Sequence, residues 1–183
     1  MSRIAPLEPP YTPEIERSLG RWMAPGAEHE PLLLFRVLHR NEELASRMFA
    51  LGSGLLAHGR LAAPDREIVI ARVTARAGCH YEWGVHAAIF ASHVGLTPAQ
   101  LKATTSGAAG PWEPRQQALI DAVDELHDTA RLSESAWDAL RPHYDDEQLL
   151  EFLVLTGWYR TISYVANGLL LENEPWARSA RPD

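Results

Sequence analysis

Proline and glycine divide this chain into segments of helical length. Thr12-Pro13 is a typical helix start, and Thr97-Pro98 opens a pattern that resembles a capping box. Apolar residues recur at helical spacing, whereas Val and Ile are not grouped in alternating runs and no Asn-Gly or Asp-Gly pair marks a hairpin. These patterns predict an all-α fold. We expect helices that begin near residues 13 and 98 and others over about 31–56, 64–77, 79–93, 113–130, 133–140 and 145–171.

The length and composition indicate one globular domain with short additions at both ends. The 183 residues are 46% hydrophobic and 22% charged, which is ordinary for a folded protein with a sizeable core. Residues 1–30 begin with a proline-rich arm followed by a short helix, and residues 31–172 contain the remaining helices. Residues 173–183 form a tail with two prolines, which we expect to be frayed.

The charge pattern argues against a nucleic-acid partner. The formal net charge is −7, Lys102 is the only lysine, and the arginines are scattered beside acidic residues. The single cysteine, Cys79, excludes a disulfide within the chain. Residues 1–10 lack the apolar run of a signal peptide, and no stretch reaches the roughly 20 apolar residues of a membrane span. We therefore predict a cytoplasmic protein without a membrane partner.

Three side chains that carry chemistry fall on one face of a predicted helix. Cys79, Glu82 and His86 stand at positions i, i+3 and i+7 and lie within an arc of about 60° at 3.6 residues per turn. Cys79 also falls near the expected start of this helix, where the helix dipole and unpaired N–H groups favour a thiolate. A thiol, a carboxylate and an imidazole on one stripe form a candidate catalytic site.

Glu67, on the preceding predicted helix, is a fourth candidate. If the two helices form a tight antiparallel hairpin around Gly78, Glu67 and His86 come within reach of each other. A Glu67–His86 hydrogen bond would then orient the imidazole and raise its basicity. Each residue alone has an ordinary explanation, as a helix-dipole partner, a surface ion pair or a small buried side chain. The coincidence of all four in one hairpin favours a functional site.

A metal site is a weaker interpretation of the same face. Glu82, His86 and His93 could line one side of the helix, but their spacing is not the His-Glu-x-x-His arrangement of zinc enzymes. No complete ligand set is evident. We predict neither a metal nor another cofactor.

The motif Cys79-x-x-Glu82-Trp83-x-x-His86, preceded by Glu67, resembles the carboxymuconolactone decarboxylase family, which includes the alkyl hydroperoxidase D branch. The flanking residues, from Pro64 to Glu67 and from Ala91 to Thr97, fit the same pattern, and the resemblance covers about residues 32–171. It implies the alkyl hydroperoxidase D-like helical bundle. It also implies catalytic roles for Glu67, Cys79 and His86, and with Glu82 from the same helix face these four are the predicted catalytic residues.

The chain departs from the hydroperoxidase branch at two positions. The members of the hydroperoxidase branch that this chain resembles use a Cys-x-x-Cys motif, with a glutamate and a histidine as proton relay. In this chain Glu82 stands in place of the second cysteine. Tyr81 stands where the branch often has a second histidine. Because no resolving thiol exists in the chain, the two-thiol peroxidase cycle is excluded within one subunit.

Three interpretations of function remain. The first is acid–base catalysis on a small organic acid or lactone, as in the family's decarboxylases, which are lyases. His86 would be the general acid or base, positioned by Glu67, with Glu82 as a second carboxylate. The second is a one-cysteine peroxidase, an oxidoreductase of the peroxiredoxin type, acting through Cys79. Its thiolate would be disfavoured by the Glu82 carboxylate. The third is a helical interaction protein without catalysis.

Aromatic residues complete the predicted site and suggest assembly. We predict Tyr81 and Trp83 as substrate-binding residues, and Trp83, Trp158, Tyr159 and Tyr164 as candidates for a flat apolar wall. The family resemblance implies a homo-oligomer, a trimer or hexamer, with a dimer as the alternative. The six tryptophans and the apolar final helix agree with such an assembly. The expected partners are a small-molecule substrate and further copies of the chain.

Overall fold

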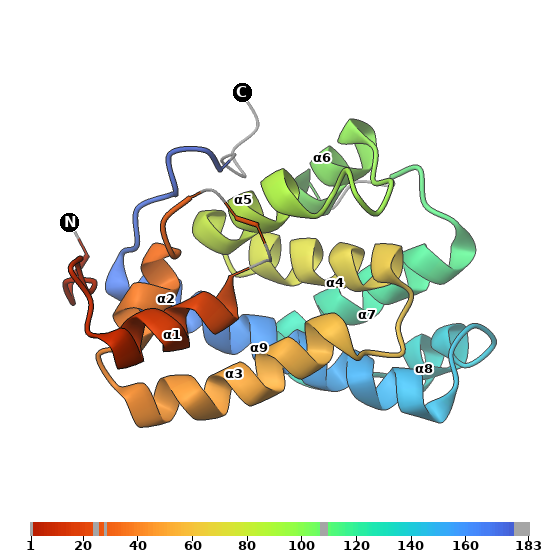
Figure 1. The fold of residues 1–183 in the computed structure, drawn as a ribbon. Helices are drawn as coiled ribbons and strands as arrows, with labels where there is room; N and C mark the ends of the chain where they lie inside the picture. Colours follow the sequence, from red (N-terminus) through yellow and green to blue (C-terminus); the bar gives the residue numbers. More distant parts are fainter. Residues whose placement is uncertain (1, 24–25, 28, 107–109, 178–183) are drawn as a thin grey trace.

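The computed structural model describes residues 2–23, 26–27, 29–106 and 110–177, and this part of the chain consists of α-helices joined by loops, without a β-strand (Figure 1). The all-α fold predicted from the sequence is therefore confirmed. No helix among these residues is both long enough and apolar enough to cross a membrane. The helices are α1 (Pro13–Trp22), α2 (Leu33–Leu38), α3 (Glu42–Ala57), α4 (Ala63–Arg76), α5 (His80–Ile89), α6 (Pro98–Ser106), α7 (Pro114–Thr129), α8 (Glu134–Leu140) and α9 (Asp146–Leu169).

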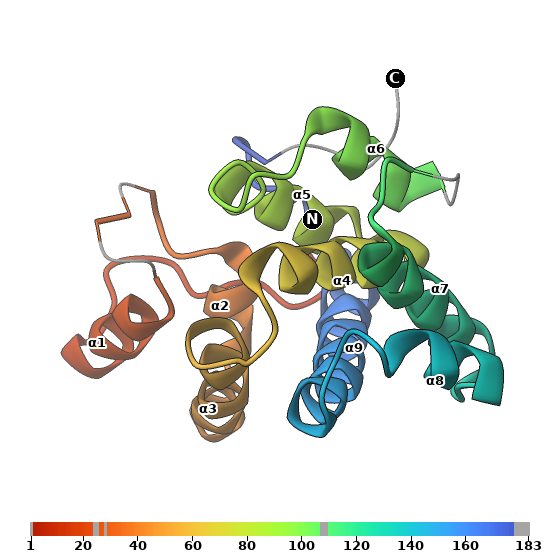
Figure 2. The same ribbon diagram turned by 90° about the vertical axis from the view of Figure 1, so that its right-hand side faces the viewer.

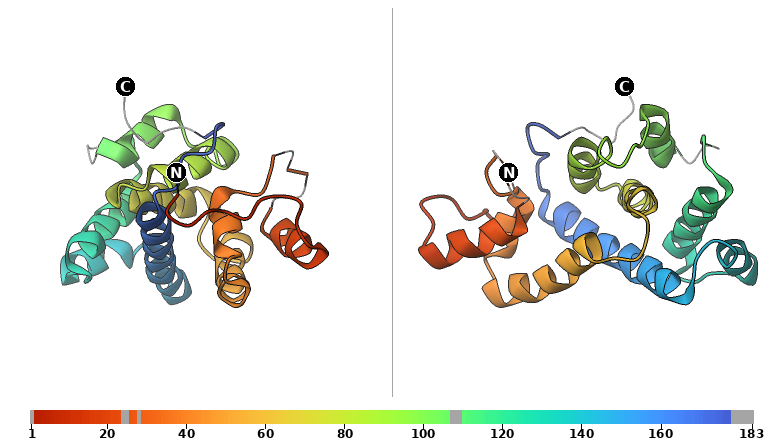
Figure 3. Two further views of the ribbon diagram at one scale, coloured as in Figure 1. Left: turned by 90° about the vertical axis from the view of Figure 1, so that its left-hand side faces the viewer. Right: turned by 45° about the vertical axis from the view of Figure 1, so that its right-hand side comes forward.

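Helix α4 lies at the centre of the fold. It contacts α5, α6, α7 and α9, and every residue from Glu67 to Thr74 is buried. Figure 2 shows α5 and α6 on one side of α4 and α3 and α9 on the other. The same layering is visible from the opposite side in Figure 3. A helix that is covered on all sides needs apolar residues around its whole circumference, and the run Ile68-Val69-Ile70-Ala71 meets this need.

The core has three parts that meet at α4 and its neighbours. One part joins α4, α7 and α9 around Ile70, Leu119 and Phe152. A second joins α2, α3, α5 and α9, and a third fills the space between α4, α5 and α6. Because α5 contributes to the second and third parts, its residues from Tyr81 to Ala87 are all buried. The chemistry-bearing face of α5 is therefore held between packed layers.

The prediction of one helix over residues 31–56 is wrong. The segment divides into α2 and α3, because the Asn41 side chain accepts a hydrogen bond from the backbone N–H of Leu44 at 3.1 Å and caps α3. The apolar spacing continues through both helices, so periodicity alone did not reveal the break. Helix α5 also ends at Ile89 rather than His93.

The first residues of the predicted tail pack on the fold. The buried carboxylate of Glu174 accepts hydrogen bonds from the Leu33 backbone N–H at 2.7 Å and from the Tyr81 hydroxyl at 2.6 Å. The chain after α9 is thus attached to the start of α2 and to α5. The rest of the predicted tail, residues 178–183, lies outside the described residues.

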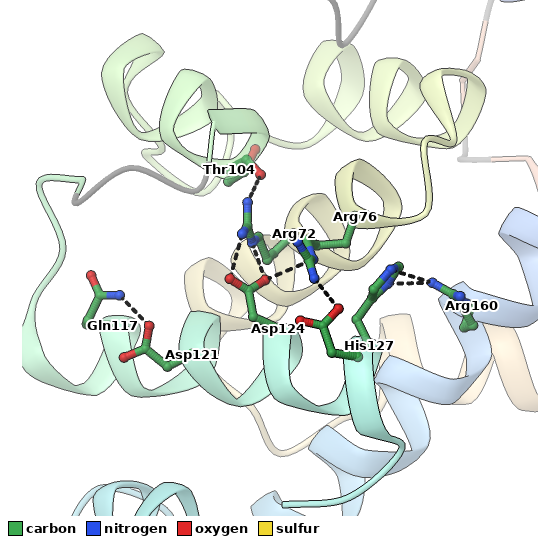
Figure 4. A network of polar contacts seen from close by, with 9 residues as sticks. Arg72, Arg76, Thr104, Gln117, Asp121, Asp124, His127 and Arg160 are labelled. Atoms are coloured by element: carbon green, nitrogen blue, oxygen red, sulfur yellow. Dashed lines mark hydrogen bonds and ion pairs between the residues drawn. The ribbon is translucent and has the colours of Figure 1, made fainter.

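A buried arginine joins α4, α6 and α7 (Figure 4). Arg72 donates two hydrogen bonds of 2.6 Å to the carboxylate of Asp124 and one of 2.8 Å to the backbone carbonyl of Thr104. Arg76 contacts both Asp124 and Asp128. The two parallel bonds from one guanidinium to one carboxylate are a strong, geometrically specific arrangement. This network fixes the three helices relative to one another.

We expect Arg72→Ala to lower the free energy of unfolding by about 2–3 kcal/mol, because it leaves the partly buried Asp124 and a buried carbonyl without their donor. Urea denaturation measures the change. Arg47→Ala is the matched control, since Arg47 forms an exposed pair with Glu43 and should change stability by less than about 0.5 kcal/mol. Equal effects of the two substitutions would contradict a structural role for the Arg72 network.

Candidate active site

The turn between α4 and α5 brings the motif residues together. Gly78 has a φ of 60°, in the left-handed region that glycine adopts without strain. The backbone N–H of Cys79 donates to the carbonyl of Thr74 at 2.8 Å, and Cys79 is the N-cap residue of α5. The two helices thus turn back on each other directly after Gly78. The hairpin places Glu67 of α4 beside His86 of α5.

Glu67 and His86 form a buried pair. Nδ1 of His86 lies 2.7 Å from Oε2 of Glu67, and the two side chains are 4% and 2% exposed. The other carboxylate oxygen of Glu67 accepts a hydrogen bond from Nε of Arg66 at 3.3 Å. Arg66 is in turn held by a hydrogen bond of 3.0 Å to the Leu56 carbonyl. The imidazole ring is therefore fixed through its Nδ1 side.

The other ring nitrogen of His86 faces two further polar groups. Nε2 lies 3.0 Å from the Tyr159 hydroxyl and 3.6 Å from Oε1 of Glu82. The second oxygen of Glu82, Oε2, is buried and has no hydrogen-bond partner among the described residues. Phe90 stacks on the imidazole at a centroid distance of 4.8 Å. The geometry thus leaves one carboxylate oxygen free beside a fixed histidine.

The charges around His86 determine its protonation. Burial by itself lowers the pKa of His86, but the carboxylates of Glu67 and Glu82 act in the opposite direction and raise this pKa to about 9. Burial likewise tends to raise the pKa of Glu67, yet the charges of His86 and Arg66 lower it below its ordinary value. At neutral pH the site therefore contains an imidazolium between two carboxylates. Its Nδ1–H donates to Glu67, and its Nε2–H points toward Glu82 and Tyr159.

Tyr159 is a neutral phenol in this site. Burial, and then the nearby charges of Glu82 and Glu67, raise its pKa well above the ordinary value of 10. It is carried by α9, 73 residues from His86 in sequence. The sequence suggested Tyr159 only as part of an apolar wall and gave no signal for its contact with the imidazole.

A cavity of about 510 Å³ opens beside these groups. Glu82, His86 and Tyr159 form its polar inner wall, and most of the other lining residues are apolar or aromatic, with Arg21, His29 and Ser53 as the polar exceptions. This volume lies within the range of sites that enclose small organic ligands. The lining side chains come from α1, α2, α3, α5, α9 and adjoining loops, and include Trp22, Leu34, Phe35, Phe49, Leu56, Val85, Ile89, Phe90, Trp158 and Ile162.

Cys79 does not belong to the lining of this cavity. The side chain is fully buried in the part of the core that joins α2, α3, α5 and α9. Burial, reinforced by the charge of Glu82, raises the pKa of the thiol to about 11, although the backbone N–H groups of Tyr81 and Glu82 and the Ser163 hydroxyl act in the opposite direction. The expectation of a thiolate at this helix start is therefore wrong, because desolvation outweighs the helix dipole.

Tyr81 and Trp83 also lie away from this cavity. The Tyr81 hydroxyl binds Glu174 and accepts a hydrogen bond from the Leu34 backbone N–H at 3.1 Å. Nε1 of Trp83 donates to the Thr104 hydroxyl at 3.0 Å, within the core beneath α6. The structure therefore gives both residues a packing role and does not bring them to the side chains that surround His86.

Two other aromatic candidates do line the cavity. Trp158 and Tyr159 contribute to its wall, whereas Tyr164 is 64% exposed on α9. His93 is exposed, and its Nδ1 contacts the Ile89 carbonyl. Among the described residues, no group of three or more His, Cys, Asp or Glu side chains is arranged to hold a metal ion.

The helical bundle has the alkyl hydroperoxidase D-like fold predicted from the sequence. The model of the carboxymuconolactone decarboxylase family matches residues 42–125, so this part of the chain is similar to that family. That match includes Glu67, Cys79, Glu82 and His86 and leaves out α1, α2, α8 and α9. A comparison with curated proteins gives no match.

Solved structures share the fold. An uncharacterized peroxidase-related protein from Silicibacter sp. TM1040 has a TM-score of 0.82 at 16% identity, and the alignment covers 98% of this chain and 97% of that protein. An uncharacterized peroxidase-related protein with an alkylhydroperoxidase AhpD core, from Ralstonia eutropha JMP134, has a TM-score of 0.79 at 18% identity, covering 96% and 95%. The debrominase Bmp8 in complex with 2,3,4-tribromopyrrole has a TM-score of 0.76 at 14% identity, covering 96% and 93%. At these identities the likeness establishes the fold alone.

Proposed function

We propose that this protein is an enzyme that transfers protons on a small, largely apolar lactone or organic acid. The observation that carries the proposal is the position of Glu82, which lines an apolar cavity beside a charged His86 and has a buried Oε2 atom without a hydrogen-bond partner among the described residues. A base and an acid on one side of a ligand are the two groups that proton transfer at carbon requires. No thiol takes part.

The proposed reaction begins at the carbon next to a carbonyl group. Glu82 removes a proton from this carbon, and the electron pair of the C–H bond moves onto the carbonyl oxygen. His86 donates its Nε2 proton or hydrogen bond to that oxygen and stabilises the enolate, while Glu67 keeps the imidazole oriented and charged. The Tyr159 hydroxyl donates a second hydrogen bond to the same oxygen. In an unsaturated substrate, return of a proton to the far carbon of the conjugated system completes a double-bond shift. In a substrate with a carboxylate on the carbon next to the carbonyl, the C–C bond to that carboxylate breaks instead, carbon dioxide leaves, the electron pair of that bond moves onto the carbonyl oxygen, and the resulting enolate is protonated at carbon.

The aromatic lining of the cavity suits a ring-shaped ligand. Phe90, Trp22 and Trp158 offer flat apolar surfaces beside the polar wall. The debrominase with this fold was solved with a brominated pyrrole, which is a small ring. A lactone or an unsaturated cyclic acid supplies both a ring and the carbonyl group that the acid–base pair needs.

Deuterium exchange tests the proposed proton transfer directly, whichever overall reaction follows from it. A panel of small lactones and unsaturated carboxylic acids is incubated with the protein in deuterium oxide, and proton NMR follows the signals of the carbons next to each carbonyl. We expect the protein to accelerate exchange in at least one of these compounds. A panel without any accelerated exchange would count against the proposal.

Cys79→Ala is expected to leave this exchange rate within about twofold of the original protein, because the thiol is outside the cavity and protonated. The substitution should cost only about 1–2 kcal/mol of stability through the small volume lost in the core. Intact-mass measurement after treatment with cumene hydroperoxide should detect no added oxygen atom. Stoichiometric oxidation of Cys79 together with hydroperoxide turnover would instead establish the one-cysteine peroxidase interpretation.

We further propose that the chain forms a homo-oligomer, a trimer or hexamer. Apolar side chains remain exposed on α9, including Leu150, Leu153 and Val154, and on α3, at Leu44 and Leu51. Exposed apolar residues grouped on two helices are typical of surfaces that bind another protein. Size-exclusion chromatography with light scattering measures the mass, and a monomer would contradict the proposal.

A further inference from the structure

An arginine stands at the solvent-exposed side of the cavity. Arg21, near the end of α1, is exposed and contributes to the cavity lining. Its guanidinium carbon lies 4.4 Å from the centroid of the Phe49 ring, which belongs to α3. Contact with an aromatic face stabilises a guanidinium cation at this position. The arrangement presents an exposed cation beside an apolar space.

Arg21 has no ion pair or hydrogen bond within the described part of the chain. The neighbouring arginines are already engaged: Arg66 contacts Glu67, and Arg36 binds Glu8 and the Leu7 carbonyl. Arg21 is also the single arginine or lysine among the described residues that line the cavity. In a chain with a net charge of −7, a cation left without an acidic partner beside the cavity is available to a ligand.

The inner wall of the cavity determines which end of an anionic ligand Arg21 can bind. Glu82 lines the inner wall, and Glu67 lies directly behind His86. A ligand carboxylate placed against Glu82 would meet a like charge in a buried site, which is costly. The same carboxylate at Arg21 meets a planar, fork-shaped donor that matches its geometry. Charge therefore orients an anionic ligand with its carboxylate outward.

We propose that Arg21 is a substrate-binding residue that holds the carboxylate of an amphipathic monoanion, whose apolar body fills the cavity and whose carbonyl end meets Glu82 and His86. This assignment rests on the proposed acid–base function of the inner wall. The assignment of Arg21 narrows the expected substrates to cyclic or open-chain organic compounds in which a single carboxylate lies far from the reacting carbon. Because Arg21 lies outside the family match at residues 42–125, the N-terminal helix supplies this specificity.

Isothermal titration with 1-naphthylacetate and its uncharged analogue 1-naphthylacetamide tests the assignment. We expect Arg21→Gln to weaken binding of the carboxylate at least about tenfold, the loss of one charged hydrogen-bonded contact, and to leave the amide within about twofold. Arg21→Lys should bind the carboxylate more tightly than Arg21→Gln but less tightly than the original protein, because lysine keeps the positive charge and lacks the two parallel N–H donors of the guanidinium. Arg17→Gln is the matched control, because Arg17 is an exposed arginine on the same helix that does not line the cavity.

Three results would overturn the assignment. The first is carboxylate binding that Arg21→Gln leaves unchanged, and the second is an equal loss for the amide. The third is no binding of the carboxylate to the original protein. Circular dichroism confirms that α1 remains folded, as expected for an exposed side chain. Deuterium exchange that persists in Glu82→Gln, together with carboxylate binding that still depends on Arg21, would reject the acid–base chemistry and keep the binding site.

Discussion

Replacement of Glu82 by glutamine is expected to lower the rate of deuterium exchange by about 10²- to 10⁴-fold, the usual contribution of a positioned general base. Glutamine has nearly the same shape as glutamate but cannot take a proton from carbon. No other aspartate or glutamate is among the described residues that line the cavity, and Glu67 is occupied by His86 and Arg66. The chemical step, rather than ligand binding, should therefore be lost.

Ligand binding and thermal stability distinguish a loss of the base from a loss of folding. Glu82→Gln should retain 1-naphthylacetate binding at Arg21 and a melting temperature close to that of the original protein. Glu42→Gln is a suitable control, since Glu42 also lies in the first turn of a helix but is exposed on α3. A Glu82→Gln protein that exchanges deuterium at the original rate would remove Glu82 from the mechanism.

Glu67→Ala should produce the largest change in stability, a loss of about 3–5 kcal/mol in the free energy of unfolding. The substitution leaves the buried His86 ring without its charged partner and opens space beside α4. Glu67→Gln is the matched variant, because it keeps the volume and a hydrogen-bond acceptor while it removes the charge. Urea denaturation at pH 7 should place its stability between those of Glu67→Ala and the original protein. A change below about 1 kcal/mol for Glu67→Ala would contradict the importance of the pair.

The pair also predicts how stability depends on pH. The pKa of His86 rises from its ordinary 6.5 to about 9 on folding, so the folded state holds a proton that the unfolded chain has released between these values. This contribution is complete below pH 6.5, and it is lost as the pH rises to about 9. The unfolding free energy of the original protein should therefore fall over this range. The decline should be smaller in Glu67→Gln, in which the largest attraction for that proton is absent.

Local signals in the sequence were sufficient for the helices and for the Glu67–His86 pair. The capping residues and prolines predicted most helix starts, and Gly78 predicted the hairpin that sets the two side chains 2.7 Å apart. Periodicity failed between α2 and α3, because Asn41 interrupts the helix without interrupting the apolar pattern. A single capping hydrogen bond therefore sets the boundary between two helices, although the pattern of apolar residues continues across it.

The parts of the site that depend on distant segments were not predictable. Tyr159 reaches His86 from α9, and Arg21 and Phe49 meet through the packing of α1 on α3. The protonated state of Cys79 depends on its complete burial, which position at a helix start did not reveal. The depth at which a side chain lies, and the segments that cover it, are properties of tertiary packing.

The protonation of His86 tests the central claim most directly, because the proposed chemistry needs an imidazolium donor beside the Glu82 base. Nitrogen-15 NMR of protein labelled at histidine measures it, with His86→Gln to assign the signals. We predict that both ring nitrogens of His86 carry protons at pH 7 and that their shifts change near pH 9, with a lower midpoint in Glu67→Gln. A neutral His86 ring at pH 7 would contradict the proposed mechanism.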